Sequence, residues 1–380
     1  MGENDLTVDT RAHEPRTVPA PHSLALMKLP IEVDDLTPEW MSDAMDAEVT
    51  SVTVLDRHTG TTGRAHVALT GHPSVPASAF VKLAPFDAAQ RRFVNRQGMG
   101  LAEARFYRDI AHDVPVRVPK VWYAEFEGTG SDPDDSYVMV LEDLVASGCR
   151  FPTREDADIE ARIFDIIEQL ALLHAKYWKS TRFGPRGDLS WIAPRGTAGG
   201  DGGAPLVQMA IDNLADQLPD GFVQFAETYI AHAPGILDLY REGECTLAHG
   251  DPHLGNLFVD GENPLRTGFL DWAVISHAPG MRDVAYVLSA STPTELRRTH
   301  EHALLARYRE VLAEHGVTLD ADLAWEQYRL FSIYGWCAAA CTAAMGSKWQ
   351  PEHIGLGGTE RGTIAVLDLD SAGLITEKLA

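Results

Sequence analysis

The segment that most restricts the fold of this chain is a polar loop followed by two short apolar runs. Asp251 precedes Asn256 by five residues, and the apolar run 257–259 follows directly. A second apolar run, 268–270, ends at Asp271, fifteen residues beyond Asn256. Short apolar runs separated by turn residues predict paired strands, which would hold the three polar side chains within a few ångströms of one another.

These three side chains form a set that phosphoryl transfer from a nucleotide requires. A carboxylate must orient the attacking hydroxyl, and an amide oxygen and a second carboxylate suit Mg²⁺. The spacing H-x-D-x-x-x-x-N over 249–256 is typical of kinase catalytic loops, and Asp271 stands where their later aspartate falls. Asp251 is therefore the candidate catalytic base, and Asn256 and Asp271 are the candidate magnesium ligands. An ordinary surface turn is the alternative for Asp251 and Asn256 taken alone.

Two other functions fit part of this pattern. His249, Asp251 and His253 alternate, as the ligands of a metallohydrolase on a strand can. Pro252 disfavours a regular strand, and the next histidine is the distant His277, so this is the weaker alternative. The other alternative is a catalytically silent nucleotide-binding module that acts through partners, although the complete set of polar residues counts against it.

The composition excludes several classes of partner. Hydrophobic residues make up 45% of the chain and charged residues 23%, as in an ordinary globular protein. The formal net charge of -23 argues against nucleic acid and anionic membranes, because both bind clustered basic residues. No apolar stretch approaches the roughly 20 residues of a membrane-spanning helix, and the N-terminus lacks a signal-peptide pattern, so we expect a cytoplasmic protein. The sequence predicts no oligomeric state.

The order of the elements predicts an α+β fold with two lobes and a cleft between them. Residues 1–22 are polar and are expected to form a flexible tail. Residues 23–144 contain strand-like runs and a helix over 97–112, which predict an N-lobe with a small antiparallel, nucleotide-binding sheet. Residues 145–380 are rich in helical patterns, of which 155–178 is the clearest. This C-lobe would carry the catalytic loop, the metal site and the substrate-binding helices.

The first lobe supplies candidate phosphate contacts. Lys82 lies inside the apolar strand 80–83, where a lysine is costly unless it meets anionic partners. Nucleotide phosphates and Glu103, on the following helix, would supply them, and an edge-strand lysine that reaches solvent is the alternative. Gly60 and Gly63 lie in a turn between two strands whose backbone N–H groups could cover phosphates, although the turn lacks the G-x-G-x-x-G pattern.

The junction between the lobes is a candidate site for the base of the nucleotide. The apolar run 137–141 leads into Glu142, Asp143 and Leu144, where the strand-like pattern ends. A segment that joins two lobes borders the cleft in which ligands bind. Glu142 and Leu144 are therefore candidates to bind the adenine base through their backbone groups.

These motifs resemble those of the aminoglycoside phosphotransferase and choline kinase-like family. The resemblance rests first on the segments 249–256 and 270–272. The segments similar to the branch related to ecdysteroid kinases are 36–40, 103–107, 141–144 and 172–178. The resemblance implies a protein-kinase-like bilobal fold, ATP and Mg²⁺ as cofactors, and transfer of the γ-phosphoryl group to a hydroxyl of a small molecule.

The resemblance also implies roles for single residues. Asp251 would be the base, Lys82 would contact phosphates and Glu103 would pair with Lys82. Asn256 and Asp271 would bind magnesium, and Asp283 matches an aspartate that braces the catalytic loop in such enzymes. The loose glycine turn departs from the family, and the chain has no Ala-Pro-Glu segment after Asp271, which argues against a regulated protein kinase.

The acceptor is expected to bind over the C-lobe, between the insertion 179–245 and the helices after residue 296. Aromatic residues there could pack on a steroid or an acyl chain: Trp191, Phe222, Phe225, Tyr229 and Trp336. Acidic residues there could instead bind an amine-bearing sugar: Asp212, Asp216, Asp220, Glu227 and Asp238. Both sets also fit helices with an apolar core face and a solvated face. Neither the acceptor nor the choice between ATP and GTP is predicted.

Overall fold

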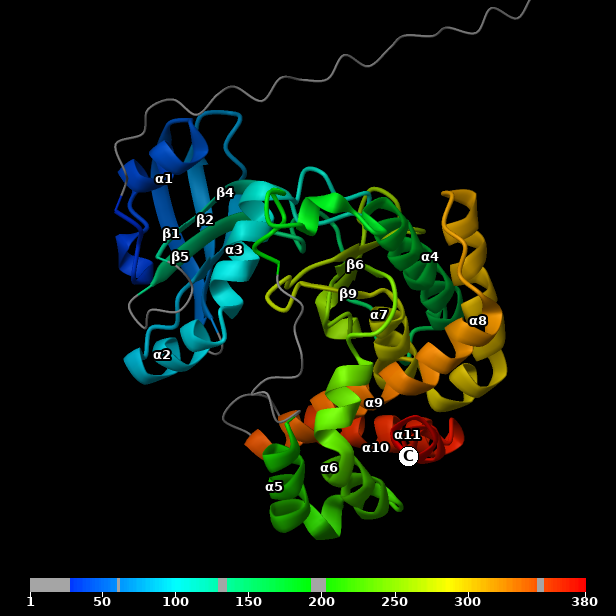
Figure 1. Cartoon of the computed structure of the whole chain (residues 1–380). Coiled ribbons are helices and arrows are strands. Elements are labelled where there is room, and N and C mark those ends of the chain that lie inside the picture. Colours follow the sequence, from blue (N-terminus) through cyan, green and yellow to red (C-terminus); the bar gives the residue numbers. More distant parts are fainter. Residues whose placement is uncertain (1–27, 60–61, 129–134, 193–202, 347–351) are drawn as a thin grey trace, which may run out of the picture.

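The computed structural model describes residues 28–59, 62–128, 135–192, 203–346 and 352–380. The predicted tail of residues 1–22 and Gly60 lie outside these residues. In Figure 1 a five-stranded sheet with short helices stands beside a larger, mainly helical body. The predicted α+β, bilobal fold is therefore confirmed.

The N-lobe is built on an antiparallel sheet with the strand order β1-β2-β3-β5-β4. Its strands are β1 (Val49–Thr59), β2 (Gly63–Gly71), β3 (Ser78–Leu83), β4 (Val121–Glu127) and β5 (Ser136–Glu142). In β2 the residues Ala65, Val67 and Leu69 are buried and those between them are partly exposed. One face of the sheet therefore packs on a hydrophobic core, and the other face borders the rest of the molecule.

The helices of the N-lobe are η1 (Val33–Asp35), α1 (Pro38–Met45), α2 (Ala88–Arg96) and α3 (Met99–Asp109). Thr37 caps α1 by accepting a hydrogen bond from Trp40 N at 3.2 Å, which is a favoured way to satisfy a free amide at a helix start. The apolar pattern of residues 118–121 predicts a strand there, but β4 begins only at Val121. Pro119 has no N–H to donate to a neighbouring strand, and sheet pairing starts beyond it.

The C-lobe consists mainly of helices. They are α4 (Ile159–Tyr177), η2 (Thr181–Phe183), α5 (Ala204–Leu214), η3 (Ala215–Gln217), α6 (Phe222–Leu239), η4 (Leu254–Asn256), α7 (Met281–Tyr286), η5 (Val287–Ser291), α8 (Thr294–Glu314), α9 (Ala321–Met345), α10 (Glu352–Asp368) and α11 (Ser371–Leu379). The largest hydrophobic cluster includes Phe106 and Met139 of the N-lobe and continues through α4, α6 and α9. This cluster therefore spans both lobes, while the other face of the sheet packs on a second cluster within the N-lobe.

The aromatic residues proposed for an apolar acceptor lie mostly in this core. The rings of Phe222, Phe225 and Tyr229 have their centroids 5.2, 4.7 and 5.4 Å from that of Trp336. All four side chains are buried. They hold α6 against α9, so they do not offer a surface to an acceptor.

Two small antiparallel sheets carry the polar loop of the C-lobe. One pairs β6 (Cys245–Ala248) with β9 (Ser276–Pro279), and the other pairs β7 (Leu257–Val259) with β8 (Thr267–Phe269). The second pairing is the one that the apolar runs predict. The loop 249–256 therefore leaves one sheet and enters the other.

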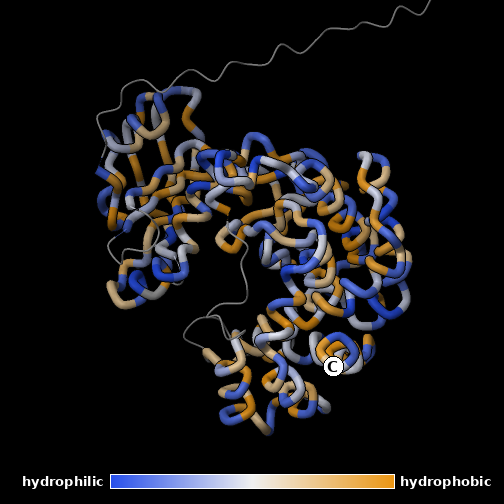
Figure 2. Tube along the Cα trace, in the orientation of Figure 1, coloured by the Kyte–Doolittle hydropathy of each residue, from blue (hydrophilic) through white to orange (hydrophobic). Residues whose placement is uncertain are grey.

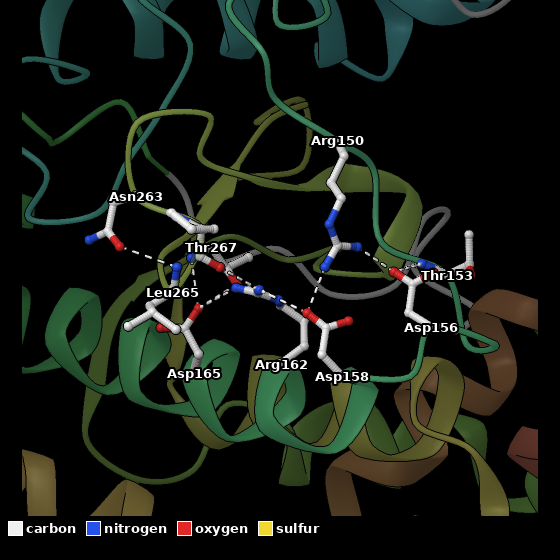
Figure 3. A network of polar contacts seen from close by, with 10 residues as sticks. Arg150, Thr153, Asp156, Asp158, Arg162, Asp165, Asn263, Leu265 and Thr267 are labelled. Carbon is white, nitrogen blue, oxygen red and sulfur yellow. Dashed lines mark hydrogen bonds and ion pairs between the residues drawn. The ribbon is translucent and has the colours of Figure 1, made fainter.

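A polar network fixes the β7–β8 pair against α4 (Figure 3). Asp165 accepts hydrogen bonds from the backbone N of Thr267 at 2.7 Å and from its hydroxyl at 2.5 Å. Arg162 donates to the Thr267 hydroxyl at 3.2 Å and to the Pro264 carbonyl at 2.7 Å. Arg150 extends the network by donating to Asp158 at 2.6 Å. The strand that leads to Asp271 is thus held at its far end by α4.

The distribution of hydrophobic residues agrees with this architecture. Figure 2 shows hydrophobic residues concentrated along the strands of the sheet and through the middle of the helical body. Among the described residues, none of the helices combines the length and the apolar character that crossing a membrane requires.

Candidate active site

The loop that carries Asp251 is held through its backbone by Asp283, in the first turn of α7. The Asp283 carboxylate accepts hydrogen bonds from His249 N at 2.6 Å and from Gly250 N at 2.9 Å. His174 Nε2 lies 3.2 Å from the same carboxylate. Burial opposes the charge of Asp283, but these partners outweigh it and lower its pKa. The structure therefore confirms that Asp283 braces the loop.

Gly250 occupies a position that only glycine fits. Its φ of +89° lies in the left-handed region, and a Cβ there would come within 2.4 Å of the Val274 carbonyl oxygen. The hydroxyl of Tyr334 donates to the Gly250 carbonyl at 3.0 Å. The backbone immediately before Asp251 is therefore held from both sides.

His249 ties this loop to the strand that leads to Asp271. Its Nε2 lies 3.0 Å from the Leu270 carbonyl oxygen, and its Nδ1 accepts a hydrogen bond from Asp251 N at 3.3 Å. Burial lowers the pKa of His249, which keeps the ring neutral. Both ring nitrogens are engaged, so His249 is not available as a metal ligand. The described residues also contain no group of three His, Cys, Asp or Glu side chains placed to hold a metal, which leaves the metallohydrolase alternative without a ligand set.

Asp251 and Asn256 are joined by hydrogen bonds across the loop. Asn256 Nδ2 donates to the Asp251 backbone carbonyl at 3.0 Å and to the Asp251 carboxylate at 3.2 Å. His253 Nε2 lies 3.6 Å from that carboxylate, whose side chain is 33% exposed. The Asn256 backbone carbonyl accepts a hydrogen bond from Leu270 N at 3.0 Å. This bond connects Asn256 to the residue directly before Asp271. The loop residues thus form one continuous hydrogen-bonded group.

Lys82, Glu103 and Asp271 meet where the two lobes face each other. Lys82 Nζ lies 2.5 Å from Glu103 Oε2 and 3.6 Å from Asp271 Oδ2. Burial opposes the charge of Asp271, but Lys82 and Arg64 outweigh it and hold its pKa below the ordinary value. Asp271 has a φ of +61°, an uncommon conformation for a residue other than glycine. The structure thus brings these three predicted residues together where the sheet meets the larger lobe.

The helix α3 and the segment after Asp271 are joined by stacked rings. The centroids of Phe106 and Trp272 are 4.0 Å apart, and the ring planes differ by 9°. Trp272 is fully buried and lies against His249, with a centroid distance of 4.6 Å. Glu103 and Asp271 are therefore positioned by neighbours that pack on each other.

Three residues predicted to contact the nucleotide remain: Gly63 in the glycine turn, and Glu142 and Leu144 at the lobe junction. A Cβ on Gly63 would come within 2.7 Å of the Phe86 ring and 2.9 Å of the Ala84 carbonyl oxygen, so close packing alone accounts for a glycine here. Glu142 lies at the junction, and both its carboxylate oxygens accept from Arg117 Nη2 at 2.7 Å. The Leu144 carbonyl accepts from Cys149 N at 2.9 Å. Within the described residues the Leu144 N–H has no acceptor.

Further residues at the site are not evident from the sequence. Arg64 lies opposite Lys82 in the β2–β3 pair, and the sequence shows only that it follows the glycine turn. His174 and Tyr334 reach the loop from α4 and α9, whose patterns indicate only helices. At the lobe junction, Asp143 accepts hydrogen bonds from Ser78 and pairs with His66, each at 2.6 Å. Strand register and helix packing bring these residues to the site, and neither is readable from local spacing.

A two-lobed fold with a sheet lysine facing an aspartate of the larger lobe, beside an Asp–Asn loop, defines the protein-kinase-like class. The chain belongs to the phosphotransferase enzyme family, whose sequence profile matches residues 75–316. No curated protein sequence matches the chain significantly.

Several solved structures share the fold. A protein from Ralstonia eutropha assigned as an aminoglycoside phosphotransferase is 15% identical, with a TM-score of 0.53 over 88% of this chain and 97% of that one. An ethanolamine kinase from Plasmodium vivax is 13% identical, with a TM-score of 0.50 over 87% of this chain and 84% of that one. A choline kinase from Streptococcus pneumoniae is 14% identical, with a TM-score of 0.49 over 87% and 97%. The first two similarities show a shared fold.

Proposed function

We propose that this protein is an ATP- and Mg²⁺-dependent kinase that transfers the γ-phosphoryl group to a hydroxyl of a small molecule. The observation that carries the proposal is the approach of Lys82 to Asp271 at 3.6 Å, beside the hydrogen-bonded pair of Asp251 and Asn256. Membership of the phosphotransferase enzyme family supports it. In this proposal residues 23–144 form the nucleotide-binding lobe and residues 145–380 form the catalytic lobe.

Asp251 is the proposed catalytic base. Phosphoryl transfer depends mainly on positioning and on stabilisation of charge, so the base does not need an unusual pKa. Asn256 Nδ2 holds one carboxylate oxygen of Asp251, and the partial exposure of the carboxylate leaves it accessible to an acceptor. Asp251 would orient the acceptor hydroxyl and take its proton as the bond from that oxygen to the γ-phosphorus forms. The bond from the γ-phosphorus to the β–γ bridging oxygen would break in the same transfer, and ADP would leave with that oxygen.

Asn256 and Asp271 are the proposed ligands of Mg²⁺. Asn256 uses its Nδ2 to hold Asp251, while its Oδ1 accepts no hydrogen bond from any described residue. The lowered pKa of Asp271 supplies an ionised carboxylate beside it. An amide oxygen and a carboxylate are donors that a hard cation prefers, so these residues fit the ion. Bound together with the nucleotide, Mg²⁺ would neutralise charge on the phosphates.

The nucleotide is proposed to lie between the sheet and the loop. Lys82 would contact the phosphates, and Glu103 would hold Lys82 in place. The Leu144 N–H is available to a base, whereas the Glu142 side chain is already bound to Arg117, so any contact from Glu142 would come from its backbone. The acceptor is proposed to be a small molecule with a hydroxyl group. We also propose that the chain belongs to the branch related to ecdysteroid kinases, on the segments 103–107 and 141–144.

Acceptor-stimulated release of ADP tests the proposed function. Alcohols, amino sugars, sterols and hydroxyacyl thioesters would be screened with Mg·ATP, and Asp251→Asn would be measured beside the wild type. We expect one class to stimulate turnover and Asp251→Asn to lower it by about 10²–10⁴-fold. ATP should bind to the variant with an affinity within about twofold of the wild type. ATP binding without turnover on any class would instead support the silent nucleotide-binding module.

A further inference from the structure

Arg64 shares a face of the sheet with Lys82. The two residues are paired directly across β2 and β3, and side chains at opposed positions of antiparallel strands project to the same side. On that side Lys82 meets Glu103 and Asp271. The guanidinium therefore faces the proposed phosphate site.

Lys82 already has carboxylate partners, whereas Arg64 has none among the described residues. Lys82 has carboxylate oxygens at 2.5 and 3.6 Å. Arg64 Nε donates to the Thr62 hydroxyl at 3.0 Å, and among the described residues no carboxylate oxygen lies within 4.0 Å of the guanidinium. A guanidinium carries five N–H donors, so the Nη groups of Arg64 have no acceptor in the described part of the chain. They are free to bind an anion.

The charges at the proposed phosphate site favour a further positive side chain beside Lys82. Lys82 stands against the carboxyl groups of both Glu103 and Asp271, so its single positive charge is already matched within the protein. A nucleoside triphosphate brings several negative charges, in a protein whose formal net charge is -23. Lys82, which is paired with Arg64 across the two strands, lies 3.6 Å from Asp271, the proposed magnesium ligand, so the side of the sheet that carries Arg64 would face the phosphates.

We infer that Arg64 binds the terminal phosphates of the nucleotide through its side chain. The packing of Gly63 against Phe86 and Ala84 supports this, because it accounts for the glycine without any phosphate contact. A planar guanidinium can donate two parallel hydrogen bonds to phosphate oxygens. The inference rests on the proposed function, since it requires a nucleotide in the cleft.

Calorimetric titration of ATP, ADP and AMP in the presence of magnesium tests the inference on the full chain. Arg64→Met should weaken the binding of ATP and ADP about ten- to hundredfold and leave AMP within about twofold, because AMP lacks the terminal phosphates. Arg64→Lys keeps the charge without the fork and should fall between the wild type and Arg64→Met. The matched control is Arg57→Met, an exposed arginine of the neighbouring strand β1, which should bind all three nucleotides as the wild type does.

Unchanged ATP affinity in a folded Arg64→Met, or an equal loss for ATP and AMP, would overturn the inference and leave the proposed function standing. Thermal unfolding of each variant establishes that it is folded. If Arg64→Met did not fold, Arg64→Lys would decide, since an ATP affinity equal to that of the wild type would exclude a need for the guanidinium fork. A wild-type protein that bound no nucleotide would overturn both the inference and the proposed function.

Discussion

The rings of Phe106 and Trp272 lie parallel with their centroids 4.0 Å apart, and they connect the helix of Glu103 to the residue that follows Asp271. The approach of Lys82 to Asp271 depends on the position of Glu103 relative to the larger lobe. This stack fixes that position from inside the shared core. It therefore links the stability of the molecule to the geometry of the proposed phosphate site.

Truncation of Phe106 should affect both properties. We expect Phe106→Ala to lower the free energy of unfolding by about 3–5 kcal/mol, because it removes a fully buried ring. It should also lower kcat per folded molecule, since α3 loses its contact with the Asp271 segment. Phe225→Ala is the matched control, because Phe225 is equally buried but packs on Trp336 in the C-lobe. Urea unfolding and kcat measured on both variants check this, and equal kcat values would contradict it.

Loss of the Asp283 carboxylate should displace the catalytic loop. Asp283→Asn leaves one oxygen to accept from two backbone amides, and its new N–H₂ group would face an N–H donor. We expect kcat to fall at least about tenfold, while affinity for AMP is kept. Asp260→Asn is the control, because Asp260 is also buried and paired with Arg266 but does not contact the loop. A similar kcat for the two variants would show that the loop holds its shape without Asp283.

The stability of the nucleotide-free protein should depend on the ionisation of Glu103. Burial raises the pKa of this carboxyl from 4.5 to about 7, against the opposing effect of Lys82. Between these pH values the folded chain binds more protons at Glu103 than the unfolded chain does. The contribution of Glu103 to the free energy of unfolding therefore falls as the pH rises through this window.

Urea unfolding of the wild type and of Glu103→Gln measures this effect. Glutamine does not titrate, so the stability of the wild type relative to the variant should decline from about pH 5 to about pH 8. A difference that stays constant over this range would show that Glu103 keeps an ordinary pKa in the folded protein.

Activity should require a divalent cation that binds through Asn256. Chelation with EDTA should abolish turnover, and added Mg²⁺ should restore it. We expect Asn256→Ala to raise the magnesium concentration for half-maximal activity by about 10–100-fold, because one oxygen ligand is lost. Asn263→Ala is the control, since the Asn263 side chain lies in the turn between β7 and β8, where it accepts a hydrogen bond from Leu265 N. Equal magnesium requirements in the two variants would remove Asn256 from the metal site.

The sequence predicts those parts of the site whose structure is decided by residues close together in the chain. The spacing of Asp251, Asn256 and Asp271 predicts two paired strands, and β7 and β8 form that pair. Thr37 before Pro38 predicts a helix start, and α1 begins there. In each case the residues that decide the structure lie close together in the chain, so their pattern is readable.

The parts that do not follow depend on contacts between distant segments. Arg64 reaches the cleft because of its register with Lys82, and apolar alternation alone does not fix which residues of two strands are opposed. The aromatic residues around Trp336 could have served as core or as an acceptor surface, and only the packing of α6 on α9 decides between these. β4 begins later than the apolar pattern predicts, because Pro119 has no N–H group to donate to a neighbouring strand.

Among the described residues, Asp283 accepts hydrogen bonds from two backbone amides of the loop and from none of the loop's side chains. Side chains of the loop that make no hydrogen bond within it can therefore differ while the backbone before Asp251 stays held. Such an arrangement separates the part of the protein that performs the transfer from the part that selects what receives it. Related chains could acquire new acceptors at the rim while the centre stays in place.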